Sequence, residues 1–178
     1  MCAVSADTEI SPPPEWGPSR SRTVTWHDPL ALAAHGAQVS GREYLQAVLD
    51  GRLPRPPIAG LLGMTLARVG DGEAVFRCTP DESSYNPIGM VHGGLLCTLL
   101  DSAAGCAAHT QLPAGVGYST IEIKASFMRA VRVETDELEV VGRVAKGGRR
   151  VAFAEAEARD GTGSLVGSAT TSLLIVGA

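Results

Sequence analysis

One carboxylate stands alone within a long apolar stretch of this chain. Asp101 is the only acidic residue in the segment 86–110, where His92, Gly93 and Gly94 precede a run of small and apolar residues. An ionised carboxylate in such surroundings is costly unless it has a partner or a function. Two glycines at a helix start leave backbone N–H groups free, and such groups can stabilise an oxyanion. These residues indicate acyl-transfer chemistry; the simpler alternative is a core helix that tolerates one Asp beside a hydroxyl.

The segment is predicted to be a buried helix that starts near Gly93, because it shows neither proline nor strand-like alternation from there to Thr110. Small residues occupy every position three, four or seven residues from Asp101: Gly94, Cys97, Thr98, Ala104, Gly105 and Ala108. Such a stripe admits a second backbone or leaves room for a ligand. Roughly 12 Å of helix separates Gly93 from Asp101, so one acyl carbonyl cannot reach both. If both act on it, Asp101 must come from a second, antiparallel copy of the helix in a two-fold dimer.

Strands account for most of the remaining C-terminal part of the chain. Six are predicted, two within 64–80 and one each within 119–131, 137–146, 149–160 and 163–176. Short turns between them imply a mainly antiparallel sheet with the long helix on one face, an α+β fold. The strand at 119–131 is predicted to be half-buried, with its apolar and polar side chains on opposite faces. The apolar set is Ile121, Ile123, Ala125 and Phe127, and the polar set is Thr120, Glu122, Lys124 and Ser126.

The N-terminal third has a different character. Residues 1–25, rich in Pro, Ser and Gly, are expected to form a disordered tail. Residues 26–55 are expected to form a helical extension with a capping-box sequence at 40–43. The proline-bounded segment 53–63 is predicted to be a loop, and residues 56–178 form the main domain.

Composition excludes several classes of function. The net charge of −4, the sequence pI of about 5.5 and the aromatic content of 4% leave no electrostatic footprint for nucleic acid or an anionic membrane. The four cysteines form no CxxC pair, which favours reduced structural thiols in a cytoplasmic protein. The N-terminus shows no secretory pattern, and the isolated histidines predict no metal site.

The string N-P-I-G-M-V-H-G-G at 86–94 carries a family resemblance. With Asp101 nine residues after His92 and Thr120 opening the next strand, it resembles the hotdog-fold acyl-CoA thioesterases of the PaaI-like, phenylacetate-pathway branch. The similarity extends over about 57–176. It implies a hotdog fold, in which a mainly antiparallel sheet wraps around one long central helix, and a homodimer or a dimer of dimers.

The resemblance also implies how the two central groups act. The carboxylate of Asp101 attacks the thioester or activates a water. The N–H of Gly93 donates to the thioester oxygen, with Gly94 beside it among the substrate-binding residues. In this family the carboxylate and the N–H donor come from opposite subunits, in agreement with the distance along the helix.

Three further polar side chains have implied roles. Asn86 helps to orient the attacking group or water, and His92 polarises the carbonyl or shapes the loop. Thr120 holds the water or the carboxylate, and Ser119 is the alternative if the alignment is shifted by one residue.

Basic residues near strand ends suit the phosphates of coenzyme A: Arg129, Lys146, Arg149 and Arg150. A solvated turn explains the same charges equally well. No cofactor is expected other than the coenzyme A of the substrate. The expected partner is thus a small acyl-CoA, with no nucleic acid and no membrane.

Three functions remain open on this fold. The first is hydrolysis of an acyl or aryl-acyl thioester to the free acid and CoA, through Asp101 and Gly93. The second is hydration or dehydration of an enoyl thioester, and the third is non-catalytic binding of acyl-CoA. The sequence leaves open the acyl group, the choice between CoA and carrier-protein thioesters, and the choice between dimer and tetramer.

Overall fold

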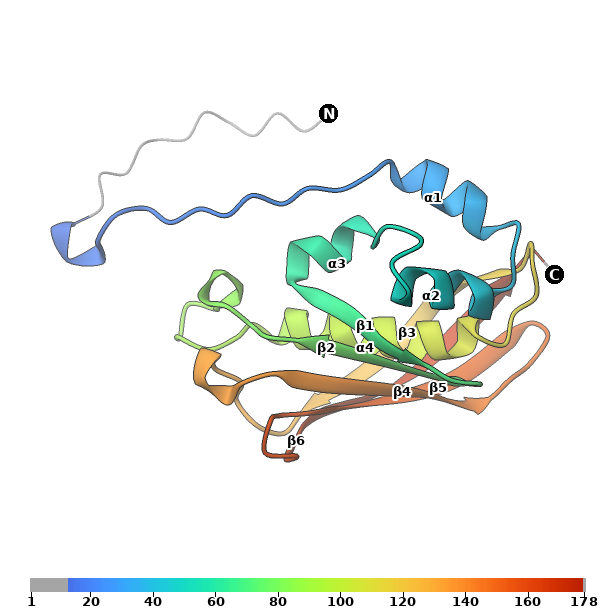
Figure 1. The fold of residues 1–178 in the computed structure, drawn as a ribbon. Helices are drawn as coiled ribbons and strands as arrows, with labels where there is room; N and C mark the ends of the chain where they lie inside the picture. Colours follow the sequence, from blue (N-terminus) through green and yellow to red (C-terminus); the bar gives the residue numbers. More distant parts are fainter. Residues whose placement is uncertain (1–12, 178) are drawn as a thin grey trace.

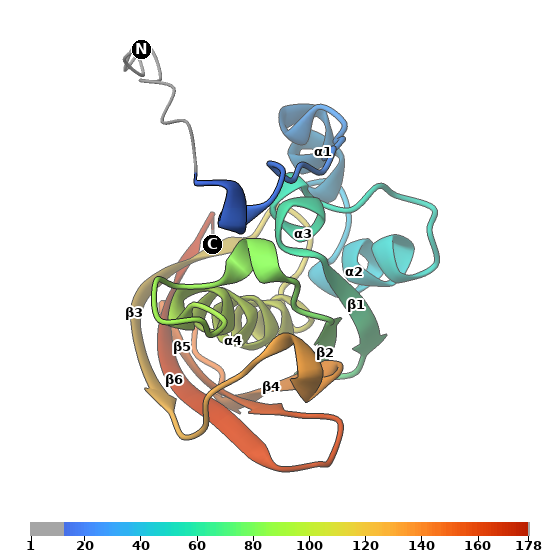
Figure 2. The ribbon, with the colours of Figure 1, turned by 90° about the vertical axis from the view of Figure 1, so that its left-hand side faces the viewer.

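A computed structural model describes residues 13–177. Within that range, a curved six-stranded antiparallel sheet in the order β1-β2-β4-β5-β6-β3 wraps around one long helix (Figures 1 and 2). The strands are β1 (Met64–Val69), β2 (Glu73–Cys78), β3 (Gly117–Phe127), β4 (Leu138–Lys146), β5 (Val151–Arg159) and β6 (Leu165–Val176). The predicted α+β class and the predicted antiparallel sheet around a central helix are confirmed.

The central helix is α4 (Gly93–His109), which starts at the predicted residue. Its leucines are buried against the sheet: Leu95, Leu96, Leu99 and Leu100. A Cβ on Gly142 of β4 would lie 2.1 Å from the carbonyl oxygen of Ala103, so the helix backbone rests directly on that strand. One face of β5 carries only alanines, and these are buried as well: Ala152, Ala154, Ala156 and Ala158. Small sheet residues therefore allow the close approach of the helix.

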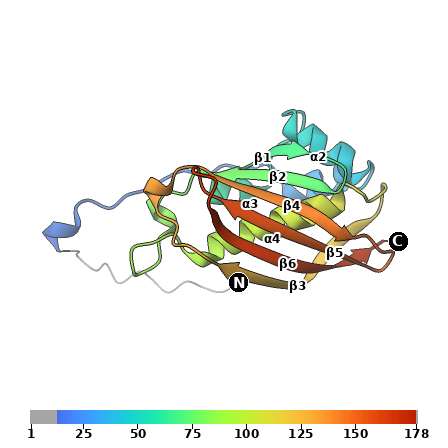
Figure 3. The same ribbon diagram turned by 90° about the horizontal axis from the view of Figure 1, so that it is seen from below.

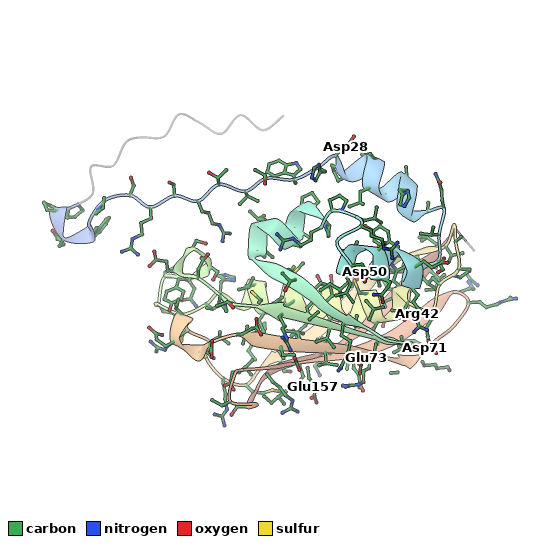
Figure 4. The ribbon with its side chains drawn as sticks, viewed as in Figure 1. Asp28, Arg42, Asp50, Asp71, Glu73 and Glu157 are labelled. Atoms are coloured by element: carbon green, nitrogen blue, oxygen red, sulfur yellow. The ribbon has the colours of Figure 1, made fainter. Side chains whose placement is uncertain are left out.

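Two short helices form most of the N-terminal extension. Helix α1 (Pro29–Gly36) follows Asp28, whose side chain accepts hydrogen bonds from the first N–H groups of the helix (Figure 4). Helix α2 (Gly41–Leu49) begins with the predicted capping box. A Cβ on Gly41 would lie 2.0 Å from the carbonyl oxygen of His109, so α2 packs tightly on the end of α4.

A third helix, α3 (Pro57–Leu62), lies within the segment 53–63, and the prediction of a loop there is wrong. Pro57 occupies the first helical position, where its missing N–H has no intrahelical partner to lose. Gly63 ends the helix in the left-handed region, with a φ of 66°. The prolines that suggested a loop therefore start a helix.

Residues 13–28 run past α3 towards α1 (Figure 1). Arg22 donates to Asp81 at 2.9 Å and also to the carbonyl oxygen of Leu61, and Arg20 pairs with Glu82. Residues 1–12 of the predicted disordered tail lie outside the described residues. Disorder of the tail and the division of the chain into the three segments 1–25, 26–55 and 56–178 stay predictions.

Strand β3 differs from the regular alternation of apolar and polar side chains that was predicted for it. Its pairing with β6 contains a β-bulge between Thr120 and Glu122, where Ile121 is an extra residue. The extra residue shifts the alternation by one position, so Thr120 and Phe127 both face α4. The prediction of opposite faces is wrong, and Ile121, predicted on the apolar face, is 57% exposed.

Figure 3 shows the face of the sheet that points away from α4. Side chains of both charges line a cavity of about 390 Å³ there, among them Lys124, Arg143, Glu155 and Glu157. The apolar core therefore lies between the sheet and α4. In the described part of the chain, no helix has the length and apolar character needed to cross a membrane.

Candidate active site

The loop before α4 is held by the side chain of His92. Its Nδ1 accepts a hydrogen bond from the N–H of Gly94 at 2.8 Å, and its backbone N–H donates to the carbonyl oxygen of Ser84 at 2.8 Å. A ring nitrogen that accepts carries no proton, so a neutral ring has its proton on Nε2, where it can donate to a substrate. A Cβ on residue 94 would lie 2.9 Å from Nδ1, so this contact favours glycine.

The two glycines therefore differ. The sequence predicts free N–H groups at both, and for Gly94 this is wrong because the ring of His92 takes that N–H as the helix cap. The N–H of Gly93 donates to no acceptor within residues 13–177. Of the two glycines, Gly93 alone therefore has no acceptor among the described residues for its N–H at the positive end of α4.

Asn86 organises the turn that leads into this loop. Its Oδ1 accepts hydrogen bonds from the N–H groups of Ile88 at 3.0 Å and Met90 at 3.2 Å. Its own backbone N–H donates to the carbonyl oxygen of Met90 at 2.7 Å. The carbonyl end of the side chain is thus used by the turn, and its Nδ2 group donates to no acceptor among the described residues.

Asp101 is half-buried in the middle of α4. The Oγ1 hydroxyl of Thr120 donates to its Oδ1 at 2.9 Å, and its Oδ2 accepts no hydrogen bond from the described residues. Ser119, the alternative hydroxyl, is exposed and precedes Thr120 in the alternating strand, so it faces away from the helix. Thr120 is the hydroxyl that meets the carboxylate.

These groups fall into two halves along α4. His92 and Gly93 lie at its start, and Asp101 with Thr120 lies near its middle. Because α4 is a continuous helix, about 12 Å of rise separates Gly93 from Asp101. The predicted separation of Gly93 and Asp101 along the helix is therefore present, and within one chain the two residues are too far apart to contact the same carbonyl group.

The four basic residues predicted for coenzyme A also separate into two groups. Arg149 and Arg150 line a cavity of about 700 Å³ beyond the C-terminal end of α4, and Lys146 ends β4 beside them. Arg129 lines a different cavity that includes Gly93, at the opposite end of the helix. All four are exposed, and none pairs with a carboxylate within 4 Å among the described residues.

Three aromatic rings meet near the C-terminal end of α4. The ring centroid of His109 lies 5.9 Å from that of Tyr44 on α2 and 5.6 Å from that of Tyr118 on β3. The ring of Tyr118 covers Gly105, where a Cβ would lie 2.6 Å from the tyrosine hydroxyl. Sequence reasoning missed this cluster because its members come from distant segments. The one signal for this cluster in the sequence is the spacing of Tyr118 and Thr120: residues two apart in a strand lie on the same face, so both side chains point towards α4.

Burial sets the protonation of these groups. It raises the pKa of Tyr44 and Tyr118, and it lowers the pKa of His109. It also raises the pKa of the Cys106 thiol to about 12 and that of the Cys78 thiol to about 11. The two thiols therefore stay protonated near neutral pH and are poor nucleophiles.

Across residues 13–177, no group of three or more His, Cys, Asp or Glu side chains is placed to hold a metal ion.

Comparison with known proteins agrees with this geometry. Residues 88–166, which include Gly93, Asp101 and Thr120, match the thioesterase superfamily. A protein of Pseudomonas aeruginosa that is provisionally named an esterase is 36% identical over 115 residues, which cover 64% of this chain and 84% of that protein.

Solved structures share the architecture. A phenylacetic acid degradation-related protein of Ralstonia eutropha JMP134, provisionally named a thioesterase, has a TM-score of 0.67 and 28% identity, with 74% of this chain and 98% of that chain covered. The PaaI protein of Escherichia coli has a TM-score of 0.68 and 20% identity, with coverage of 78% and 97%. The smu.793 protein of Streptococcus mutans UA159, bound to acetyl-CoA, has a TM-score of 0.59 and 20% identity, with coverage of 64% and 89%. The predicted hotdog fold is confirmed.

Proposed function

Because the chain belongs to the thioesterase superfamily, we propose that it hydrolyses the thioester of an acyl-CoA or aryl-acyl-CoA to the free acid and CoA. The observation that carries the proposal is the half-buried carboxylate of Asp101, which the hydroxyl of Thr120 holds at 2.9 Å. That bond orients one carboxylate oxygen and leaves the other for the substrate or for water. The acetyl-CoA bound to the S. mutans structure supports acyl-CoA as the class of substrate.

Asp101 drives the reaction by one of two routes. As a nucleophile, its Oδ2 bonds to the thioester carbon, the thiolate of CoA leaves and takes up a proton, and water then hydrolyses the mixed anhydride. As a general base, it takes a proton from the water that attacks the same carbon. Both routes place negative charge on the carbonyl oxygen. The free N–H of Gly93 donates to that oxygen in either case.

Two neighbouring side chains assist in this proposal. The Nε2–H of His92 donates to the carbonyl oxygen, since its Nδ1 is already occupied by Gly94. The Nδ2 group of Asn86 orients the water or the carboxylate, since its Oδ1 is occupied by the turn.

A complete site requires two copies of the chain, because about 12 Å of helix separates Gly93 from Asp101. Strand β3 is a suitable surface for pairing: it lies at an edge of the sheet, pairs with β6 alone among the described strands and exposes Ile121. Pairing of β3 with its own copy about a two-fold axis makes the two α4 helices antiparallel. Asp101 of one protomer then faces Gly93 of its partner, in a dimer or a dimer of dimers.

The same arrangement accounts for the separated basic residues. In antiparallel helices, the C-terminal end of one α4 lies near the start of the other. Lys146, Arg149 and Arg150 of one protomer would thus come nearer to Arg129 of the partner, and in this proposal the four basic side chains bind the phosphates of coenzyme A.

Asp101→Asn and Asp101→Ala test the assignment. We expect kcat for CoA release to fall by about 10³-fold or more, or roughly 4 kcal/mol of barrier, with little change in unfolding free energy. Release of free thiol is measured over a panel of acyl-CoAs, and loss of the enoyl double bond is followed in parallel. Unchanged turnover in both variants would refute the role of Asp101. Hydration of enoyl-CoA without thiol release would favour a hydratase, and tight binding without turnover would favour a binding module.

Mixed dimers test the composite site. Gly93→Pro removes the N–H at the first helical position, where proline is tolerated, and His92 already has the extended ψ of 133° that a following proline requires. An equal mixture of this variant and Asp101→Ala should recover about a quarter of wild-type activity, since half of the dimers would contain one intact site. No recovery after confirmed subunit exchange would place both groups in one chain.

A further inference from the structure

A cavity of about 310 Å³ lies beside Gly93, between the start of α4, the end of β3 and the start of β4. Apolar side chains form most of its wall, among them Met90, Leu96, Phe127, Met128 and Leu138. Pockets for small molecules begin at about 300 Å³. The cavity therefore has room for an acyl group and no room for a whole acyl-CoA.

Phe127 is the side chain that meets Gly93. A Cβ on Gly93 would lie 3.1 Å from Cε2 and 3.3 Å from Cζ of Phe127, so the edge of the ring lies against the helix start. The bulge at Ile121 is what turns Phe127 to this face together with Thr120. An acyl chain whose carbonyl oxygen is bound at the Gly93 N–H would therefore lie close to this ring inside the cavity.

The apolar wall disfavours an anionic acyl group here. Arg129 is the single charged residue in the described wall of the cavity, and its side chain is exposed. A carboxylate on the acyl chain would lose its hydration among apolar side chains.

We propose that this cavity receives the acyl chain and that Phe127 limits its length, so that the substrates are acyl-CoAs with uncharged, apolar acyl groups of short to medium length or compact aryl groups. The proposal rests on the thioesterase function proposed above. Phe127 is a specificity-determining residue in this proposal, because its ring lies against Gly93 and lines the cavity.

The test uses CoA thioethers with butyl, octyl and dodecyl chains, whose binding by calorimetry needs no hydrolysis. Each additional buried methylene strengthens binding about fourfold. Wild-type protein should bind the octyl thioether more tightly than the butyl one and gain no more from dodecyl. Phe127→Ala opens the cavity and should tighten dodecyl binding relative to butyl by about tenfold, with a similar change in kcat/KM for the matching acyl-CoAs. Phe127→Trp should shift the preference towards butyl.

Phe153→Ala is the matched control, because it removes a half-exposed ring of β5 that does not line this cavity. It should leave the chain-length preference unchanged. Equal effects of Phe127→Ala on all three thioethers would overturn the proposal, as would wild-type preference for succinyl-CoA over butanoyl-CoA. Chain-length effects as expected without any thiol release would refute the thioesterase function alone. Normal thiol release with an unchanged preference in Phe127→Ala would refute the role of Phe127 alone.

Discussion

Replacing Thr120 with valine tests the geometry of the site, because valine nearly keeps the shape of threonine and removes the hydroxyl that donates to Oδ1 of Asp101 at 2.9 Å. A hydrogen bond to a charged group contributes about 1.5–3 kcal/mol. A change of about 1.4 kcal/mol in barrier is tenfold in rate. Asp101 is half-buried, so water replaces part of the lost bond. We therefore expect kcat to fall by about 10- to 30-fold.

The assay is steady-state release of the CoA thiol from the best acyl-CoA substrate. KM should change little, because Thr120 orients the carboxylate and does not hold the substrate itself. Thr120→Ser keeps the hydroxyl and should retain kcat within about threefold of wild type. Ser119→Val is the neighbouring control, since Ser119 is exposed and faces away from α4, and it should change kcat by less than about twofold.

Two results would refute this reasoning. Wild-type kcat in Thr120→Val would mean that the hydrogen bond does not orient the reacting carboxylate. A loss in Thr120→Ser as large as that in Thr120→Val would mean that the methyl group, and hence packing, is what matters. Urea unfolding of each variant separates a loss of fold from a loss of orientation.

Two further predictions concern stability. Gly142→Ala should lower the unfolding free energy by about 3 kcal/mol in urea titrations, because its Cβ would lie 2.1 Å from the carbonyl oxygen of Ala103 and α4 would have to move off the sheet. Gly117→Ala is the control: its Cβ would lie 3.5 Å from its nearest neighbour, and the unfolding free energy should change by less than about 0.5 kcal/mol. Equal effects of the two substitutions would contradict the close approach of α4 to β4. Burial lowers the pKa of His109, so the folded state disfavours the charged form of its ring. The unfolding free energy should therefore decrease as the pH falls below the ordinary histidine pKa of 6.5. His109→Gln should weaken this dependence of unfolding free energy on pH, and an unchanged dependence would assign it to other groups.

Much of the fold was predictable because it depends on neighbours in sequence. The helix start at Gly93 follows from a small and apolar run without proline or strand-like alternation. The strands follow from alternating apolar residues between glycine turns. The capping box of α2 likewise involves residues three positions apart. Prolines at 54–57 misled the prediction because the same residue type stands in loops and at the first position of a helix such as α3.

The site was predictable only in part. Residue types and spacing, together with the family resemblance, single out Asp101, Gly93 and Thr120 as candidates. They do not show that the ring of His92 occupies the N–H of Gly94, since a rotamer decides that contact. They also do not show that Arg129 lies at one end of α4 while Arg149 lies beyond the other, since strand order decides that.

The sequence by itself determined the long helix and the six strands of this protein. It also determined the position of one carboxylate within that helix and the roughly 12 Å that separates it from the Gly93 N–H, because helical rise is a local property of the backbone. Only the tertiary structure decided which side chains meet. The bulge at Ile121 exists through the pairing of β3 with β6, and it turns both Thr120 and Phe127 towards α4. Register between strands far apart in the chain depends on packing of the whole sheet, and alternation within one strand carries no record of it.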